Sequence, residues 1–207
     1  MMKIGLTGNY FSGHDEVGKI FKKLNVKVFD ADLLLRYFIN FSPNHIKKIQ
    51  TNLGKDSYSL GVLNIDKFRK KNHLEDLLDF CEFDILVAYA RFRLLMKDES
   101  YTIFKYSFLF EREMEADFDY IVNCSRPKTL REKDLKNYTR IPTIAINNIL
   151  DGEMSEKEKN ISSNFIVRNN DTDYLEKGFD KWNDVYDQVE RIHNTLSKKI
   201  PQNILGD

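Results

Sequence analysis

The first forty residues alternate between short apolar runs and one amphipathic segment. The apolar run at residues 3–7 predicts a buried strand, which Gly8 ends. From Asp15 onward the apolar residues recur at helical spacing, which predicts a helix that Asn25 closes. Residues 26–29 then predict a second buried strand. Strand, glycine turn, helix and strand in this order indicate a parallel sheet with right-handed crossovers.

The rest of the chain continues this alternation of helical and strand patterns. Helical spacing extends from residue 33 to residue 39 and over most of residues 43–96, apart from a turn at residues 60–62. Three more strands are expected at residues 101–109, 118–122 and 165–167, with a charged helix up to residue 117 and a closing helix over residues 174–199. The pattern therefore predicts an α/β protein in which a parallel five-stranded sheet is flanked by helices.

Length and charge narrow the class of protein. The 207 residues suit a single domain over residues 1–207. The 32 acidic and 32 basic residues cancel, which argues against nucleic acid as a partner, because nucleic-acid binders normally carry a basic surplus. Cys81 and Cys124 lie far apart, as expected of two buried thiols in a reduced compartment. With no apolar run long enough for a signal peptide or a membrane span, we expect a cytoplasmic protein with no membrane partner.

Two glycines frame the turn between the first strand and the first helix. A phosphate loop needs a pair of glycines at the spacing of Gly8 and Gly13 in this setting, because backbone amides then surround the phosphates at the positive end of a helix. The alternative is an ordinary turn between a strand and a helix. The candidate phosphate-binding residues are Gly8, Asn9, Ser12, Gly13, His14, Asp15 and Glu16.

The two residues after Gly13 differ from the usual phosphate loop. A lysine that contacts the β- and γ-phosphates, and then a serine or threonine that holds Mg²⁺, normally follow the second glycine. Here His14 and Asp15 take these positions. A phosphate favours the charged form of His14, so the imidazole is a partial substitute for the lysine. Asp15 offers Mg²⁺ a ligand, yet its negative charge repels the phosphates. We therefore expect phosphate binding to persist and catalysis to suffer.

Two aspartates follow the second predicted strand. Asp30 and Asp32 lie at its carboxyl end, and this edge of an α/β sheet is where ligands gather. Because side chains alternate along an extended segment, both carboxylates are expected on the same side. One of them can orient an acceptor hydroxyl and take up its proton during phosphoryl transfer. The alternative is that Asp32 only caps a helix that begins at Leu33.

These motifs resemble those of the dephospho-coenzyme A kinase family, from about residue 3 to residue 171. Residues 3–8, the Ser12–Gly13 pair and residues 28–32 follow the opening of that family closely, and Arg36 stands at the family's interval after Asp32. Weaker likenesses are a glycine and aspartate turn at residues 61–66, a strand end at residues 107–111, and a lid helix and final strand at residues 159–170.

The resemblance implies a three-layer P-loop kinase fold with a helical substrate region at about residues 40–97 and a lid at about residues 128–160. It also implies that ATP and Mg²⁺ are used to phosphorylate the ribose 3′-hydroxyl of dephospho-CoA. By position Asp32 is the catalytic base, and Arg140 and Lys159 are lid cations over the transferred phosphate, with Arg140 also catalytic. The residues placed near the acceptor are Asp30, Arg36 and Glu111.

Three functions stay open on the sequence. The first is a dephospho-CoA kinase that is impaired by the changes at His14 and Asp15. The second is a catalytically inactive pseudo-kinase that acts as a binding or structural module with a protein partner. The third is a nucleoside-monophosphate kinase with an atypical loop. All three share the fold, and they differ in turnover and in the phosphoryl acceptor.

Overall fold

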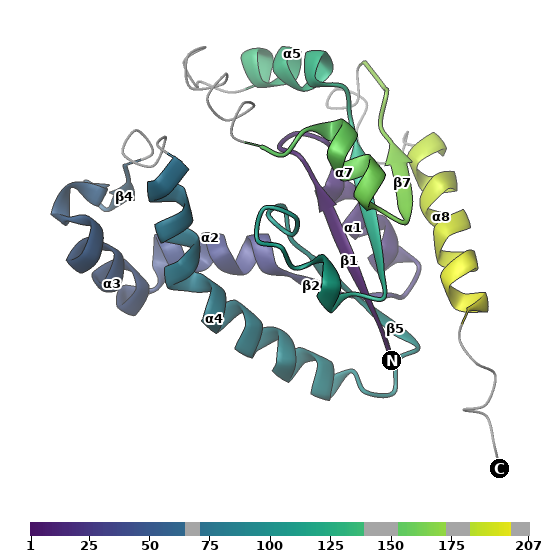
Figure 1. Ribbon diagram of the computed structural model, residues 1–207, viewed down its shortest axis with the longest axis horizontal. Helices are drawn as coiled ribbons and strands as arrows, with labels where there is room; N and C mark the ends of the chain where they lie inside the picture. Colours follow the sequence, from purple (N-terminus) through teal and green to yellow (C-terminus); the bar gives the residue numbers. More distant parts are fainter. Residues whose placement is uncertain (65–70, 139–152, 173–182, 200–207) are drawn as a thin grey trace.

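The computed structural model describes residues 1–64, 71–138, 153–172 and 183–199 (Figure 1). The helices and strands in these ranges are β1 (Met2–Gly8), α1 (His14–Lys23), β2 (Lys27–Asp30), α2 (Ala31–Phe41), α3 (Pro43–Leu53), β3 (Tyr58–Ser59), β4 (Val62–Leu63), α4 (Lys71–Leu95), β5 (Tyr101–Lys105), β6 (Tyr120–Ser125), α5 (Lys128–Tyr138), α7 (Glu156–Ser162), β7 (Phe165–Arg168) and α8 (Asn183–Lys198). Single turns of 3₁₀ helix lie at Lys55–Ser57 and Glu115–Asp117.

Five parallel strands form the central sheet, in the order β2-β5-β1-β6-β7. β1 lies in the middle, where Leu6 pairs with Lys105 of β5 and Gly8 pairs with Cys124 of β6. Because all five strands run in the same direction, their carboxyl ends meet at one edge of the sheet. That edge carries Gly8, Asp30 and Lys105. The parallel five-stranded sheet that the pattern predicts is confirmed.

Helices cover both faces of this sheet, so the molecule has three layers (Figure 1). Burying an aliphatic side chain contributes roughly 1.5–3 kcal/mol, so the apolar stripes of the helices hold them on the sheet. On the face covered by α1 and α8 the buried residues include Ile4, Leu6, Val17, Ile20, Phe21, Ile103, Val122, Val185, Val189 and Leu196. On the face covered by α2 and α4 they include Ala31, Leu35, Leu78, Cys81, Ile85, Tyr89, Phe104 and Ile121.

A smaller helical part stands beside the sheet, at the left of Figure 1. It consists of α3, the hairpin of β3 and β4, and the first half of α4, around a small core of Ile49, Tyr58 and Leu77. The Tyr58 hydroxyl donates a hydrogen bond to the Ile39 carbonyl at 2.6 Å, which ties the hairpin to α2. This part is therefore joined to the sheet through α2 and α4.

The segment after β5 differs from the prediction. The sequence predicts a strand through residue 109 and then a charged helix, but β5 ends at Lys105 and residues 107–113 form turns. Glu113 has φ 52°, in the left-handed region that interrupts a right-handed helix. The Met114 amide donates to the Leu109 carbonyl at 3.0 Å, which closes a turn in place of a helix. The predicted charged helix is wrong, because turn bonds satisfy this backbone.

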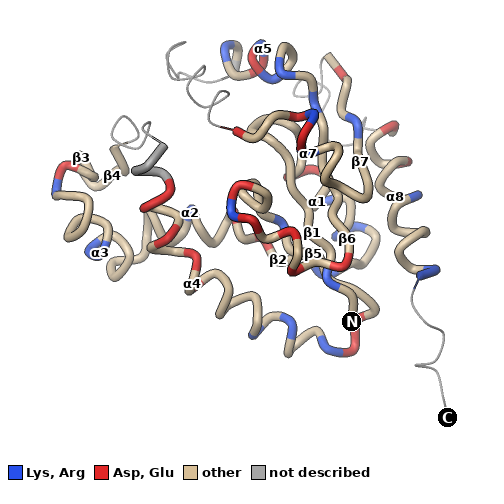
Figure 2. Tube along the Cα trace, in the orientation of Figure 1, with Lys and Arg blue, Asp and Glu red and all other residues tan. Residues whose placement is uncertain are grey.

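Charges of both signs are spread over the described part of the chain (Figure 2). Lys and Arg positions are interspersed with Asp and Glu positions on helices and loops alike. Among the helices in the described ranges, none combines the length and hydropathy that crossing a membrane requires. The charges that matter most to the site are local, at the carboxyl edge of the sheet.

Candidate phosphate-binding and catalytic site

The loop between β1 and α1 has the backbone of an anion-binding turn. A side chain on Gly8 would place its Cβ 2.9 Å from the Cys124 carbonyl oxygen, so only glycine fits there. Gly13 caps α1 with φ 99°, a left-handed conformation that favours glycine. The Ser12 amide donates to the Asn9 carbonyl at 2.9 Å and curls the loop. The amides of His14 and Asp15, the first two of α1, lie at the positive end of the helix dipole, so they can receive a phosphate.

Residues in and directly after β6 and β7 bind the backbone of this loop. The Ser12 carbonyl accepts hydrogen bonds from Asn169 Nδ2 at 2.9 Å and from Cys124 Sγ at 3.2 Å. Asn169 Oδ1 in turn accepts from the buried Arg126 guanidinium at 3.3 Å, and Arg126 forms an ion pair of 2.7 Å with the buried Asp134. No local sequence signal points to Arg126 or Asn169 as site residues, because only the sheet brings them to the loop.

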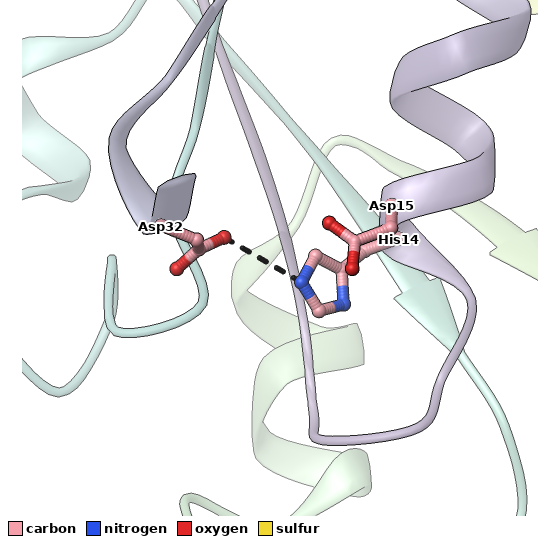
Figure 3. A group of neighbouring side chains, drawn as sticks. All are labelled: His14, Asp15 and Asp32. Atoms are coloured by element: carbon pink, nitrogen blue, oxygen red, sulfur yellow. Dashed lines mark ion pairs between the residues drawn. The ribbon is translucent and has the colours of Figure 1, made fainter. Parts of the chain in front are cut away.

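His14 points along the sheet edge toward the first turn of α2 (Figure 3). Its Nδ1 lies 3.2 Å from Ser12 Oγ, and its Nε2 lies 3.0 Å from Ser107 Oγ and 3.6 Å from an Asp32 carboxylate oxygen. The side chain is almost fully buried. The imidazole therefore contacts the candidate base and Ser107, a residue for which the sequence analysis gave no role in the site.

The two aspartates after β2 sit differently from the prediction. The extended segment ends at Asp30, and Ala31 already begins α2. Asp30 is the residue that caps this helix, because its carboxylate accepts a hydrogen bond from the Leu33 amide at 2.9 Å. The prediction that Asp30 and Asp32 alternate along an extended segment is therefore wrong, and so is the alternative that Asp32 caps the helix. The two carboxylates still approach a common partner, Lys105, because the first helical turn brings Asp32 back toward the sheet.

Asp32 is held in place by three groups. Its Oδ1 accepts a hydrogen bond from the Ser107 amide at 2.9 Å, and its Oδ2 lies 3.3 Å from Lys105 Nζ and 3.6 Å from His14 Nε2. Burial by itself raises the pKa of this carboxyl, but the hydrogen bond and electrostatic effect of His14, the Lys105 ammonium and the Ser107 amide outweigh burial and hold the pKa of Asp32 well below its usual value. Asp32 therefore stays ionised at neutral pH and is a weak base.

This low pKa predicts how stability depends on pH. A carboxyl whose native pKa is lowered stabilises the fold fully above its unfolded pKa of about 4, and this contribution is lost progressively as pH falls from there through the lowered native pKa. We expect Asp32→Asn to lower the free energy of unfolding by about 2 kcal/mol at pH 6 and by less at pH 3, where part of the contribution is already lost. Urea unfolding at both pH values measures this, with the exposed Asp98→Asn as control. An equal loss at pH 3 and pH 6 contradicts the assignment.

Lys105 is the residue that the sequence analysis missed at the centre of the site. It ends β5, its side chain is 2% exposed, and its Nζ contacts the carboxylates of Asp15, Asp30 and Asp32. Burial lowers the pKa of Lys105, but the three carboxylates outweigh burial and raise it, so the ammonium stays charged. For Asp15 the directions are reversed: burial raises its pKa, but the electrostatic effect of His14 and the hydrogen bond and charge of Lys105 outweigh burial and lower it. The sequence signal that could have identified Lys105 is a lysine at the end of an otherwise apolar strand.

A carboxylate from another part of the chain lies on the phosphate loop. The Tyr10 amide donates a hydrogen bond to Glu153, and Arg131 Nη1 donates to Glu153 Oε2 at 2.7 Å and to the Tyr10 carbonyl at 3.0 Å. Burial raises the pKa of Glu153, and the contacts with Arg131 and the Tyr10 amide offset only part of this effect. One amide of the loop is therefore bound to an internal anion. The sequence offered no local signal for Glu153 or Arg131.

Lys159 and Glu111, both predicted site residues, meet beside Ser107. Lys159 Nζ lies 2.9 Å from Glu111 Oε1 and donates to the Ser107 carbonyl at 3.1 Å. Glu111 also accepts a hydrogen bond from the Met154 amide at 3.2 Å, and the Met154 carbonyl accepts one from Asn9 Nδ2 at 3.0 Å. These bonds connect α7 to the start of the phosphate loop. A buried cation therefore lies beside Ser107, which also contacts His14, and its role as a lid cation stays a prediction.

The remaining predicted residues are placed less centrally. Glu16 and Arg36 line a pocket of about 280 Å³ between α1 and α2, which also reaches Asp15 and Asp30. Arg36 is exposed, and its Nε donates to the Asp32 carbonyl at 3.4 Å. Arg140 lies outside the described residues. Of the groups that can bind a metal, His14, Asp15 and Asp32 bring ligand atoms within 4.8 Å of one another.

Solved structures share this architecture. A crystal structure of a protein from Thermus thermophilus matches with a TM-score of 0.69 at 17% identity, over 97% of this chain and 98% of that chain. The dephospho-CoA kinase from Campylobacter jejuni matches with a TM-score of 0.54 at 17% identity, over 95% and 97%. A shikimate kinase from Bacteroides thetaiotaomicron gives 0.53 at 16% identity, over 95% and 98%. At such identities the likeness is one of fold, the three-layer α/β fold of P-loop kinases.

Sequence comparison is more specific. A dephospho-CoA kinase from Coxiella burnetii is 26% identical over 182 residues, which cover 83% of this chain and 89% of the relative. One from Clostridium tetani is 22% identical over 182 residues, which cover 83% of this chain and 79% of the relative. The sequence model of the dephospho-CoA kinase family matches residues 2–174, most of the chain. The chain therefore belongs to the dephospho-CoA kinase family.

Proposed function

We propose that this chain binds ATP at the loop between β1 and α1 and transfers its terminal phosphoryl group, slowly, to the ribose 3′-hydroxyl of dephospho-CoA. The proposal rests on the short distance between the loop and the candidate base. Asp32 Oδ2 lies 3.6 Å from Nε2 of His14, the first residue of the helix that follows the loop. Phosphoryl transfer depends on positioning and charge, and this arrangement brings a carboxylate to the phosphate end of the loop.

Asp32 is the proposed base. Its carboxylate orients the acceptor hydroxyl and takes its proton as the phosphoryl group moves. Asp30, Arg36 and Glu111 are proposed to face the acceptor, within a substrate region of about residues 40–97. Lys159, which is buried and paired with Glu111, is proposed to act with Arg140 as a cation of the lid at about residues 128–160.

Three features support a slow rate. His14 replaces the loop lysine, and losing one preorganised cation or donor commonly costs about 10²–10³ in rate. The low pKa of Asp32 weakens it as a base, because proton uptake is best near the operating pH. Glu153 already bonds the Tyr10 amide of the loop, so the incoming phosphates compete with an internal carboxylate.

The test is product formation by the purified chain. ATP is offered with dephospho-CoA and, separately, with a panel of nucleoside monophosphates, and the products are separated by chromatography. We expect slow formation of CoA, above the level of an Asp32→Ala variant, and no nucleoside diphosphate. If CoA formation equals that of Asp32→Ala, the kinase proposal fails. If the monophosphates are preferred, the acceptor is wrong and the third function of the sequence analysis is favoured.

A second candidate is a pseudo-kinase that binds its ligands without turnover. The contact of Glu153 with the Tyr10 amide and Arg131 favours it, because a filled loop suits a structural or binding role. This candidate predicts that ATP or dephospho-CoA raises the melting temperature while no product forms. Ligand binding to the native state must raise apparent stability, so a thermal shift without turnover separates the two candidates.

A further inference from the structure

The carboxylates at the sheet edge converge on one ammonium group. Lys105 Nζ contacts Asp15, lies 3.0 Å from Asp30 Oδ1 and lies 3.3 Å from Asp32 Oδ2. These three residues come from the start of α1, the end of β2 and the start of α2. A buried ammonium with three carboxylate partners is well compensated, because each charge has an opposite charge within contact distance.

The path of the lysine side chain fixes where this ammonium lies. Lys105 pairs with Leu6 in the centre of the sheet, and its side chain is 2% exposed. Its stem crosses α1 at Gly18, where an added Cβ would lie 3.2 Å from Lys105 Cδ. The stem thus lies between the sheet and a helix position that has no side chain. The ammonium is held in the site by packing as well as by charge.

The same place is where a phosphate-loop enzyme is expected to hold its metal ion. In P-loop enzymes Mg²⁺ is bound by the hydroxyl that follows the loop lysine and by an aspartate at a strand end. In this chain Asp15 stands at the position of that hydroxyl, and the strand that ends beside β1 presents Lys105. The expected metal ligand at the strand end is therefore replaced by a cation.

The residues present do not fit a divalent ion. Mg²⁺ requires oxygen atoms at about 2.0–2.1 Å in a nearly octahedral arrangement. His14, Asp15 and Asp32 do bring ligand atoms within 4.8 Å of one another. However, one oxygen of each aspartate, Asp15 Oδ1 and Asp32 Oδ2, is in contact with Lys105 Nζ. A metal ion on these oxygens would occupy the volume of the ammonium and be repelled by it.

We propose that Lys105 is a built-in cation that takes the place of the divalent metal ion, so that the site excludes Mg²⁺ and phosphates bind it without metal. The single positive charge of the Lys105 ammonium replaces the two charges of a divalent ion, and it already interacts with three carboxylates. The site therefore attracts phosphates less strongly than a metal-loaded site. The exclusion of Mg²⁺ follows from these contacts alone, and only the binding of phosphates without metal rests on the proposed function.

The first test uses Mn²⁺ alone, a substitute for Mg²⁺ whose free ion is counted by electron paramagnetic resonance. We expect no uptake by the wild-type protein at millimolar Mn²⁺. Lys105→Met removes the charge and keeps an apolar stem, and it is expected to bind Mn²⁺ at least about tenfold more tightly, since ligand charge governs such affinities. Adding Asp15→Asn to Lys105→Met should cancel the gain. Lys19→Met, which removes an exposed lysine lining the same pocket, is the matched control and should change nothing.

The proposal is overturned if the wild type takes up Mn²⁺ and Asp15→Asn abolishes that uptake. It is also overturned if Lys105→Met, shown by circular dichroism to be folded, binds no more Mn²⁺ than the wild type does. A second measurement needs no variant: calorimetry of ATP binding to the wild type in EDTA and in Mg²⁺, where dissociation constants within about threefold are expected. ATP binding that requires Mg²⁺ contradicts the proposal. Absence of ATP binding in both buffers removes the proposed function, and the Mn²⁺ result still decides the role of Lys105.

Discussion

The triple variant His14→Lys/Asp15→Ser/Lys105→Asp is expected to form CoA about 100-fold faster than the wild type, in the range that one preorganised charge contributes. Lysine at position 14 supplies the contact to the β- and γ-phosphates, and serine at position 15 supplies the metal ligand. The change at Lys105 is needed as well, because its ammonium otherwise stays beside Asp30 and Asp32. Initial rates with saturating ATP, Mg²⁺ and dephospho-CoA measure the effect.

The intermediate variants make this result interpretable. His14→Lys/Asp15→Ser alone is expected to stay within about tenfold of the wild type, because the place of the metal remains filled. Adding Asp32→Ala to the triple variant should abolish the gain. If the double variant matches the triple variant, Lys105 is no obstacle to metal. If neither variant gains turnover, the acceptor side has also changed and the binding-module candidate is favoured.

Arg126→Met is expected to lower the free energy of unfolding by about 3–5 kcal/mol, the range found when one member of a buried ion pair is removed. Arg126 and Asp134 are both almost fully buried, and 2.7 Å separates Arg126 Nη2 from the Asp134 carboxylate. Methionine has a similar length but leaves that carboxylate without its charge partner. Arg126 also bonds the carbonyl of Asn169, which supports Ser12 of the phosphate loop.

Urea unfolding measures this loss, and a second substitution serves as the control. Arg126→Met/Asp134→Leu should recover much of the stability, because replacing both members of a buried pair by apolar groups is often neutral. A loss below about 1 kcal/mol in the single variant would mean that water reaches Asp134 and that the pair matters little.

Local pattern was sufficient where neighbouring residues decide the structure. β1, the glycine-framed loop and α1 follow from an apolar run, two glycines and a helical repeat that are contiguous in the chain. The charged segment before β6 was wrongly predicted to be a helix, because Glu113 adopts a left-handed conformation that the composition of the segment does not indicate. The alternative interpretation placed the helix cap at Asp32, whereas Asp30 caps α2, because strand and helix join there without a linker.

The centre of the site could not be read from any one segment. Asp15, Asp32 and Lys105 lie on three elements, and only the strand order that places β5 between β1 and β2 brings them together. The individual aspartates were found because their spacing is local. The ammonium that neutralises them was missed, because pairing across the sheet is a property of the fold. Arg131 and Glu153 meet at the loop for the same reason.

The carboxylate of Glu153 behaves as a tethered competitor of any incoming anion. A group attached to the same chain acts at an effective concentration in the millimolar range, whatever the concentration of the protein. A single phosphate ion must therefore compete with a carboxylate that stays bound beside Tyr10 and Arg131. We expect a polyphosphate chain, which can first bind the amides at the start of α1, to displace the glutamate more readily than a single phosphate does, so ligands with more phosphates should bind more tightly.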